Sequence, residues 1–349
     1  MKKNIKRLDD TLKSLIDEYT GFGEPVSSRV LYEKYMSHVS PATLRIDLNK
    51  LEQMNFIHQP HTSAGRVPTI NGYRKYISII TSELNELEYD KKDILRQLLI
   101  RNYKDTQLAL HYIKQILANE SDQLSFVAEP EVSNDYLSDL QVFQLSPRKL
   151  IFVLSLDSGL DKTVILNTEY DVTDAQLKKM VSYVREDLLG ERIFDIAHRY
   201  LNEMSELVKK SNFLLEQFLL ELHKAFTSIS DFYIQFDGKL SFLEQPEFDD
   251  KKNIMNFMTL VQRQDLLINM MRNHDNGDDY NILMGEDFGD GLWYDFAVIY
   301  AKYEVFDIPG YLGLVCPVRN NFRKNITMIR DFAKTITQTT KQGLVSVNK

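Results

Sequence analysis

The stretch VSPATLRIDLNKLEQM (residues 39–54) decides the fold of the N-terminal part of the chain. Ser40 can cap a helix with its hydroxyl, and Pro41 fits the first helical turn, where its missing N–H is not needed. Apolar residues then recur at steps of three and four, at Leu44, Leu48 and Leu51. This spacing predicts a helix that runs to about Met54 and buries its leucine side.

Two helices precede this stretch and a short hairpin follows it. Apolar residues between positions 5 and 19 predict a first helix, and Ser27 opens a second. We expect a short strand at 56–58, a polar loop at 59–68, a return strand and a further helix at 72–87. This order is typical of a winged helix-turn-helix, in which the helix after the turn enters the major groove and the hairpin lies along the DNA backbone.

The outward side of the helix in 39–54 is a candidate DNA-reading surface. If the leucines face inward, helical geometry turns five side chains outward: Ala42, Thr43, Ile46, Asn49 and Gln53. Small, amide and methyl-bearing side chains suit base edges, whereas Arg45 and Lys50 on the flanks can reach guanine or phosphate. A solvated helix face is the alternative interpretation.

The loop QPHTSAGR (59–66) brings several phosphate donors together on a backbone that can approach closely. The candidate DNA-binding residues come from this loop and from the two helices before it. They are Ser28, Thr43, Arg45, Asn49, Lys50, His61, Thr62, Ser63 and Arg66. An ordinary polar hairpin tip is the alternative for the loop.

The charge distribution favours a nucleic-acid module at the N-terminus. The whole chain of 349 residues has a net charge of −8, but residues 1–80 carry +4 and the remainder −12. A basic N-terminal unit on an acidic body suits binding of phosphates by that unit alone, although an asymmetry of this size can also arise by chance. No apolar run approaches the ~18–20 residues that span a bilayer, and no secretory signal is present, so we expect a cytoplasmic protein without membrane partners.

The rest of the chain predicts an α+β, multidomain architecture. Strands are expected at 140–145, 150–156, 163–166, 232–236, 280–284, 294–303 and 311–316; helices are expected at 173–228, 251–271 and 322–336. Strands interrupted by a long helical segment indicate one domain inserted into another. We therefore assign residues 1–80 to a DNA-binding domain, 81–150 and 230–349 to a discontinuous α+β domain with a helical connector at 81–120, and 151–229 to an inserted, mainly helical domain.

Three segments closely resemble the heat-inducible transcription repressors of the HrcA family. They are GEPVSSRVL (23–31), residues 39–54 and QPHTSAGRVPTINGYRKYI (59–77), the last being highly specific. Looser matches follow at EFDD (247–250), ILMGED (282–287) and GLVCPVRNNF (313–322). One position departs from the family: Ile46 stands where asparagine is common, and it can offer a base edge only methyl groups.

The resemblance implies a homodimeric repressor of chaperone genes. It implies binding of an inverted-repeat operator of the CIRCE type, with activity modulated by the chaperonin. It also implies a winged-helix domain and a GAF-like domain, with a dimerisation domain inserted into the GAF-like one. A rival interpretation is a regulator whose GAF-like domain releases DNA when it binds a small ligand.

Catalytic and metal-binding patterns are weak. The chain contains no Walker loop, HExxH or GxSxG, so we expect no enzyme and no cofactor, and an enzyme with an accessory nucleic-acid domain is a remote alternative. His58 and His61 lack a carboxylate or thiolate partner, and the acidic stretch at 275–295 does not fit a calcium loop, so no metal is expected. A single cysteine, Cys316, excludes a disulfide framework and suits a small core residue.

Overall fold

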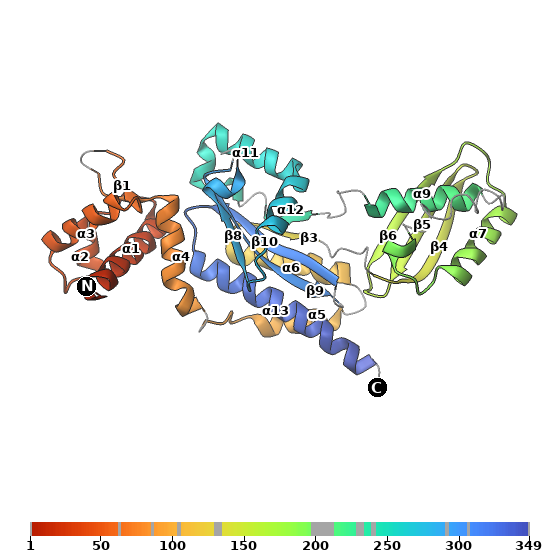
Figure 1. The fold of residues 1–349 in the computed structure, drawn as a ribbon, viewed down its shortest axis with the longest axis horizontal. Helices are drawn as coiled ribbons and strands as arrows, with labels where there is room; N and C mark the ends of the chain where they lie inside the picture. Colours follow the sequence, from red (N-terminus) through yellow and green to blue (C-terminus); the bar gives the residue numbers. More distant parts are fainter. Residues whose placement is uncertain are drawn as a thin grey trace.

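Three units follow one another along the long axis of the computed structural model (Figure 1). The structure describes residues 2–347 except 62–63, 85–86, 103–105, 129–134, 197–212, 228–233, 239–241, 290–292 and 306–307. We call these parts the N-terminal unit (residues 2–84), the central unit (87–128 and 234–347) and the insert (135–227). The prediction of an α+β chain is confirmed.

The N-terminal unit has the predicted order of helices and hairpin. Its elements are α1 (Lys2–Phe22), α2 (Ser28–Lys34), α3 (Pro41–Gln53), β1 (Ile57–His58), β2 (Val67–Pro68) and α4 (Ile70–Leu84). The Ser40 hydroxyl accepts a hydrogen bond from the Thr43 backbone N–H at 3.2 Å, so α3 begins where the sequence predicts. Its three leucines, Leu44, Leu48 and Leu51, are buried as predicted.

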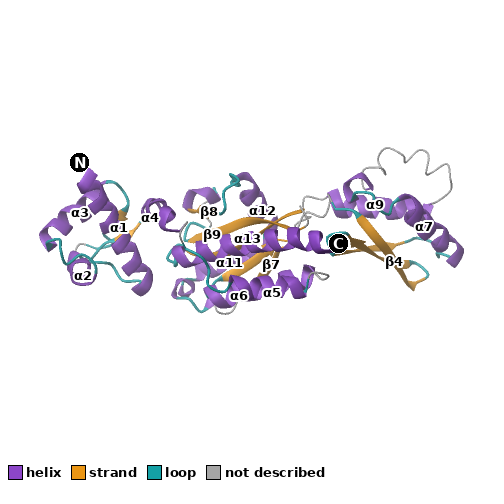
Figure 2. Ribbon diagram, turned by 90° about the horizontal axis from the view of Figure 1, so that it is seen from below, coloured by secondary structure: helices purple, strands orange, loops and turns teal. Residues whose placement is uncertain are grey.

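The central unit is a five-stranded antiparallel sheet between two helical layers (Figures 1 and 2). The strands, in spatial order, are β7 (Ile234–Asp237), β3 (Leu124–Ala128), β10 (Ile308–Pro317), β9 (Phe296–Val305) and β8 (Asn281–Met284). One face packs on α5 (Lys92–Arg101), α6 (Thr106–Ser121) and α13 (Phe322–Val347). The other face packs on η2 (Pro246–Asp249), α11 (Lys251–Gln262), α12 (Gln264–Asn273) and η3 (Gly285–Phe288).

Strand periodicity explains why this sheet needs helices on both sides. In β9, Ala297 and Ile299 point to the face covered by α13, whereas Val298 and Tyr300 point to the face covered by α12. All four residues are buried, so the first part of the strand, residues 296–301, is apolar on both faces rather than alternating.

The insert has its own sheet and its own core. It consists of β4 (Leu137–Ser146), β5 (Lys149–Leu156), β6 (Asp161–Asn167), α7 (Asp174–Asp187) and α9 (Phe213–Thr227). The sheet order is β4-β5-β6, and its helix-covered face includes Leu140, Phe152 and Val164. The chain leaves the central sheet at Ala128 and returns at Ile234, and these two residues are register partners. The two ends of the insert are therefore close together, as a domain insertion requires.

Three sequence-based boundaries are wrong. The insert does not span 151–229, because β4 pairs with β5 along its length and both contribute to the core of the insert. The segment 81–120 is not a separate connector, since α5 packs on α13 and α6 packs on the central sheet. The helix expected over 251–271 is interrupted at Arg263, which has a non-helical backbone. Strand β3 has no counterpart among the strands predicted from the sequence.

Candidate nucleic-acid interface

The outward side of α3 presents polar side chains that the fold leaves unengaged. Arg45, Asn49 and Lys50 are exposed, and none of them has a hydrogen bond or ion pair with the described part of the chain. Ile46 lies among them and is 55% exposed. Thr43 is partly buried, and its hydroxyl hydrogen-bonds that of Ser40 at 2.9 Å. The arrangement offers one amide, two cations and one aliphatic side chain on a single helix face.

Two of the three unpaired cations described in residues 4–84, Arg45 and Lys50, lie on α3. Arg74 pairs with Asp287 of the central unit, and six further cations are in ion pairs inside the N-terminal unit: Arg7, Lys13, Arg29, Lys34, Arg66 and Lys75. Among the described side chains of residues 4–84, only Lys6, Arg45 and Lys50 have no such partner. The charge available to a phosphate is therefore smaller than the sequence count suggests.

A buried carboxylate fixes the orientation of α3. Asp47 is fully buried and accepts two hydrogen bonds from the Arg7 guanidinium of α1, at 2.6 Å to Oδ2 and 3.0 Å to Oδ1. These bonds raise the pKa of the Arg7 guanidinium. A bidentate pair of this kind restrains rotation of the helix about its axis, so the outward side chains keep their direction.

The hairpin is attached to the segment before α2 by its backbone. Val26 and Arg66 exchange two hydrogen bonds, at 2.9 Å from the Val26 N–H and 2.8 Å from the Arg66 N–H. At Gly65, a Cβ atom would lie only 2.5 Å from the carbonyl carbon of Val26, so the close approach requires glycine. His61 is exposed at the loop, whereas Thr62 and Ser63 lie outside the described residues.

Two candidate residues are placed differently from expectation. The Arg66 guanidinium is only 16% exposed and pairs with the carboxylate of Glu52 on α3 at 3.0 Å, which favours a role in holding the loop rather than phosphate contact. Ser28 is buried in the first turn of α2, so its side chain is not presented to solvent. The pairing of Arg66 with Glu52 joins two residues that only the folded chain brings together, so the sequence does not indicate it.

Other candidate sites do not assemble in the described residues. There, no three His, Cys, Asp or Glu side chains form a metal-binding group. The acidic stretch is partly neutralised by contacts that the sequence does not indicate: Asp275 accepts from the Tyr311 hydroxyl at 3.1 Å, and Asp279 pairs with Lys334 of α13. Cys316 is buried in β10, where burial raises the pKa of its thiol, so its prediction as a core residue is confirmed.

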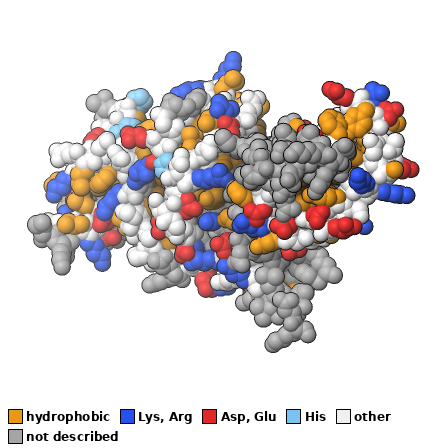
Figure 3. Space-filling view, turned by 45° about the vertical axis from the view of Figure 1, so that its right-hand side comes forward, with side chains coloured by type: hydrophobic (Ala, Val, Ile, Leu, Met, Phe, Trp, Pro, Cys, Tyr) orange, Lys and Arg blue, Asp and Glu red, His pale blue; other side chains and the backbone are white. Residues whose placement is uncertain are grey.

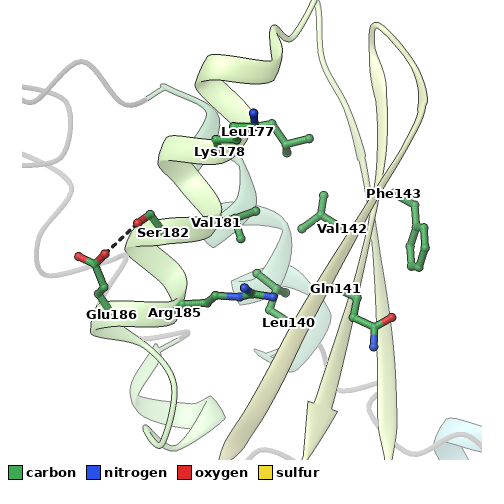
Figure 4. Close-up of a pocket in the computed structure, with 10 residues that line it drawn as sticks. All are labelled: Leu140, Gln141, Val142, Phe143, Leu177, Lys178, Val181, Ser182, Arg185 and Glu186. Carbon is green, nitrogen blue, oxygen red and sulfur yellow. Dashed lines mark hydrogen bonds between the residues drawn. The ribbon is translucent and has the colours of Figure 1, made fainter.

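One cavity lies in the insert, remote from α3. It is a groove of about 640 Å³ between α7 and β4, lined by apolar Val142, Leu177 and Val181 and by the charged Lys178 and Arg185, whose side chain reaches from α7 toward β4 (Figure 4). A second cavity of about 300 Å³ lies beside Asp275 and Lys334 in the central unit. No helix in the described part of the chain is both long enough and apolar enough to cross a bilayer.

Comparisons with known proteins agree on one family. Residues 107–326 match the model of the HrcA protein C-terminal domain. A heat-inducible transcription repressor HrcA of Natranaerobius thermophilus is 28% identical over 95% of each chain. The heat-inducible transcription repressor HrcA of Halalkalibacterium halodurans is 26% identical over 94% of this chain and 95% of its own. A crystal structure described as a hypothetical protein has a similar fold, with a TM-score of 0.63 at 21% identity, and covers 95% of this chain and 98% of its own.

Proposed function

This chain belongs to the HrcA family, and on that premise we propose that it is a heat-shock transcription repressor that binds operator DNA through the outward side of α3. The observation that carries the proposal is the unengaged group formed by Arg45, Asn49 and Lys50 on a helix that follows a short turn. Together with the hairpin, these elements correspond to a winged helix-turn-helix, and the central unit to a GAF-like domain. The expected setting is the cytoplasm.

Different side chains of α3 are assigned to base contacts and to phosphate contacts. Asn49 can donate to and accept from an adenine edge, and Ile46 can contact a thymine methyl group. Arg45 and Lys50 flank them and can reach guanine or the phosphate backbone. The exposed imidazole of His61 extends the backbone contact along the hairpin.

Homodimerisation is assigned to the insert. The sheet face away from α7 and α9 carries a row of apolar side chains at one register, formed by Phe143, Ile151 and Ile165. Phe143 and Ile165 are 50% and 49% exposed, and hydrophobic side chains gather on the surface of the insert in Figure 3. Such a row suits a twofold, self-complementary contact, which would let two copies of α3 read the halves of an inverted repeat.

A binding experiment tests the assignment of α3. The full-length chain is titrated against the DNA upstream of its own chaperone genes, as wild type and as R45A/K50A. Neutralisation of ~6–10 phosphates predicts a fall in wild-type affinity of roughly 10³–10⁵-fold between 50 and 200 mM salt. The double variant should bind more weakly with a shallower salt dependence. R263A also removes one exposed cation, in the central unit, and should bind like wild type.

A second experiment tests modulation by the chaperonin. The denatured chain is refolded with and without chaperonin, and DNA-binding activity is recovered in each case. A chain with three units and an insert that exposes apolar side chains is prone to aggregate during folding, so a higher yield with chaperonin is expected. Equal yields would argue against this part of the proposal.

A further inference from the structure

An arginine of the central unit holds the N-terminal unit in place. Arg319 lies between β10 and α13, and its Nη1 donates to the backbone carbonyl of Thr20, near the end of α1, at 3.2 Å. The same guanidinium binds Oε1 of Glu247 through Nε and Nη2, each at 2.7 Å. The guanidinium also lies against Gly23, where a Cβ atom would be 3.7 Å from its central carbon. One side chain thus joins the last turn of α1 to an acidic residue of the central unit.

A second arginine makes the reverse contact. Arg74 of α4, in the N-terminal unit, donates to the Met284 carbonyl at 2.9 Å and to the Asp287 carboxylate at 2.7 Å. Met284 and Asp287 lie at the end of β8 and in η3 of the central unit. The contacts at Arg319 and Arg74 therefore run in opposite directions across the same boundary, beside which α4 lies in Figure 1.

Apolar packing continues between the two contacts. The rings of Tyr73 and Phe322 lie 5.7 Å apart across the boundary, and both residues are buried. Ile70 approaches Gly285 so closely that a Cβ there would be 2.8 Å from the isoleucine Cγ2. Two polar contacts and apolar packing therefore join the two units, and a pivot of the N-terminal unit would break at least one of these contacts.

We propose that Arg319 and Arg74 are positioning residues for DNA binding, which fix the orientation of the N-terminal unit and thereby the separation of the two α3 helices in the dimer. This inference rests on the proposed function. Each base pair added between the half-sites moves one of them by about 3.4 Å and rotates it by about 35°. Rigidly held units cannot follow that movement, so the protein should be strict about the spacing of its inverted repeat.

The test measures spacing preference rather than affinity alone. Affinities are measured for the inverted repeat that wild type protects, for versions with the spacer changed by one or two base pairs, and for a single half-site. The variant is R319M/E247Q/R74M/D287N, in which Glu247 and Asp287 become neutral so that no carboxylate loses its guanidinium partner. R263M/D265N, which removes an exposed arginine–carboxylate pair of the central unit, is the matched control.

The variant should bind the single half-site like wild type, while its penalty for an altered spacer falls by about five- to tenfold, as expected for loss of a coupled contact network. The control should keep the wild-type spacing profile. An unchanged profile in the variant, or an equal loss of affinity on every DNA including the half-site, would overturn the proposal. Failure of wild type to bind any inverted repeat would instead reject the proposed function, and this inference with it.

Discussion

Neighbouring side chains on α3 offer a DNA duplex different interactions. Asn49 is an exposed amide that can pair with one particular base, whereas Lys50 is an exposed cation that neutralises any phosphate. Both lack partners in the described residues, so replacing either one leaves no buried group unsatisfied. Substitution of Asn49 or Lys50 should therefore change DNA binding without a large effect on folding.

We predict that N49A and K50A weaken DNA binding in different ways. N49A should cost ~1–3 kcal/mol on the preferred operator and much less on operators altered at one base pair. K50A should weaken all sequences alike and reduce the salt slope by about one. A panel of operator variants titrated at several salt concentrations measures both. Identical patterns for the two variants would contradict the roles assigned to them.

Residue chemistry alone does not predict which basic groups are free. Arg45 and Arg66 look alike in the sequence, but Glu52, near the C-terminal end of α3, pairs with Arg66. Neither that pair nor the contacts of Arg319 could be predicted, since each joins residues that only the folded chain brings together. The exposure of Arg45 and Asn49, by contrast, follows from the leucine spacing of α3.

Among the helices and strands, local sequence patterns predicted the position of α3 correctly. They did not predict strand β3 or the bounds of the insert. Ser40 and Pro41 mark a helix start by chemistry that acts within one turn. The strand β3 (LSFVA) is buried on both faces, so it lacks the alternation that identifies a strand, and its partner β7 lies about a hundred residues later. The sequence shows the strands of the insert but not which sheet they join.

The contact between α1 and α3 gives a prediction at this scale. Replacing Arg7 by alanine would leave Asp47 charged, buried and without its bidentate partner, which should cost about 3 kcal/mol of unfolding free energy. Denaturant unfolding of the full chain measures the loss. The double variant R7M/D47L removes both charges and should recover much of the stability; no recovery would show that the pair itself is not the cause.

At the scale of the whole molecule, the reading surface and the proposed dimer contact lie at opposite ends of the row of units (Figure 1). The N-terminal unit shares a continuous apolar core with the face of the central sheet that α13 covers. The insert has a separate core and joins the central unit through the paired ends of β3 and β7. The orientation of each α3 in a dimer therefore depends on every unit between the two ends.

We predict that F143D dissociates the dimer without unfolding the chain. Phe143 is half exposed, so a carboxylate there costs little in the monomer but opposes burial in an apolar contact. An aromatic anchor of this kind should be worth about 2 kcal/mol or more, measured as a rise in the dissociation constant by sedimentation. K179D changes an exposed residue of α7 on the other side of the sheet and should leave the dimer intact.

The proposed function requires that two copies of α3 in a dimer contact the two halves of one DNA site. A hydroxyl-radical footprint of the full-length chain on the DNA upstream of its own chaperone genes tests it most directly. We expect two protected half-sites related by an inverted repeat, with protection of both weakened together in N49A. No protection, or a single protected stretch without twofold symmetry, would contradict it.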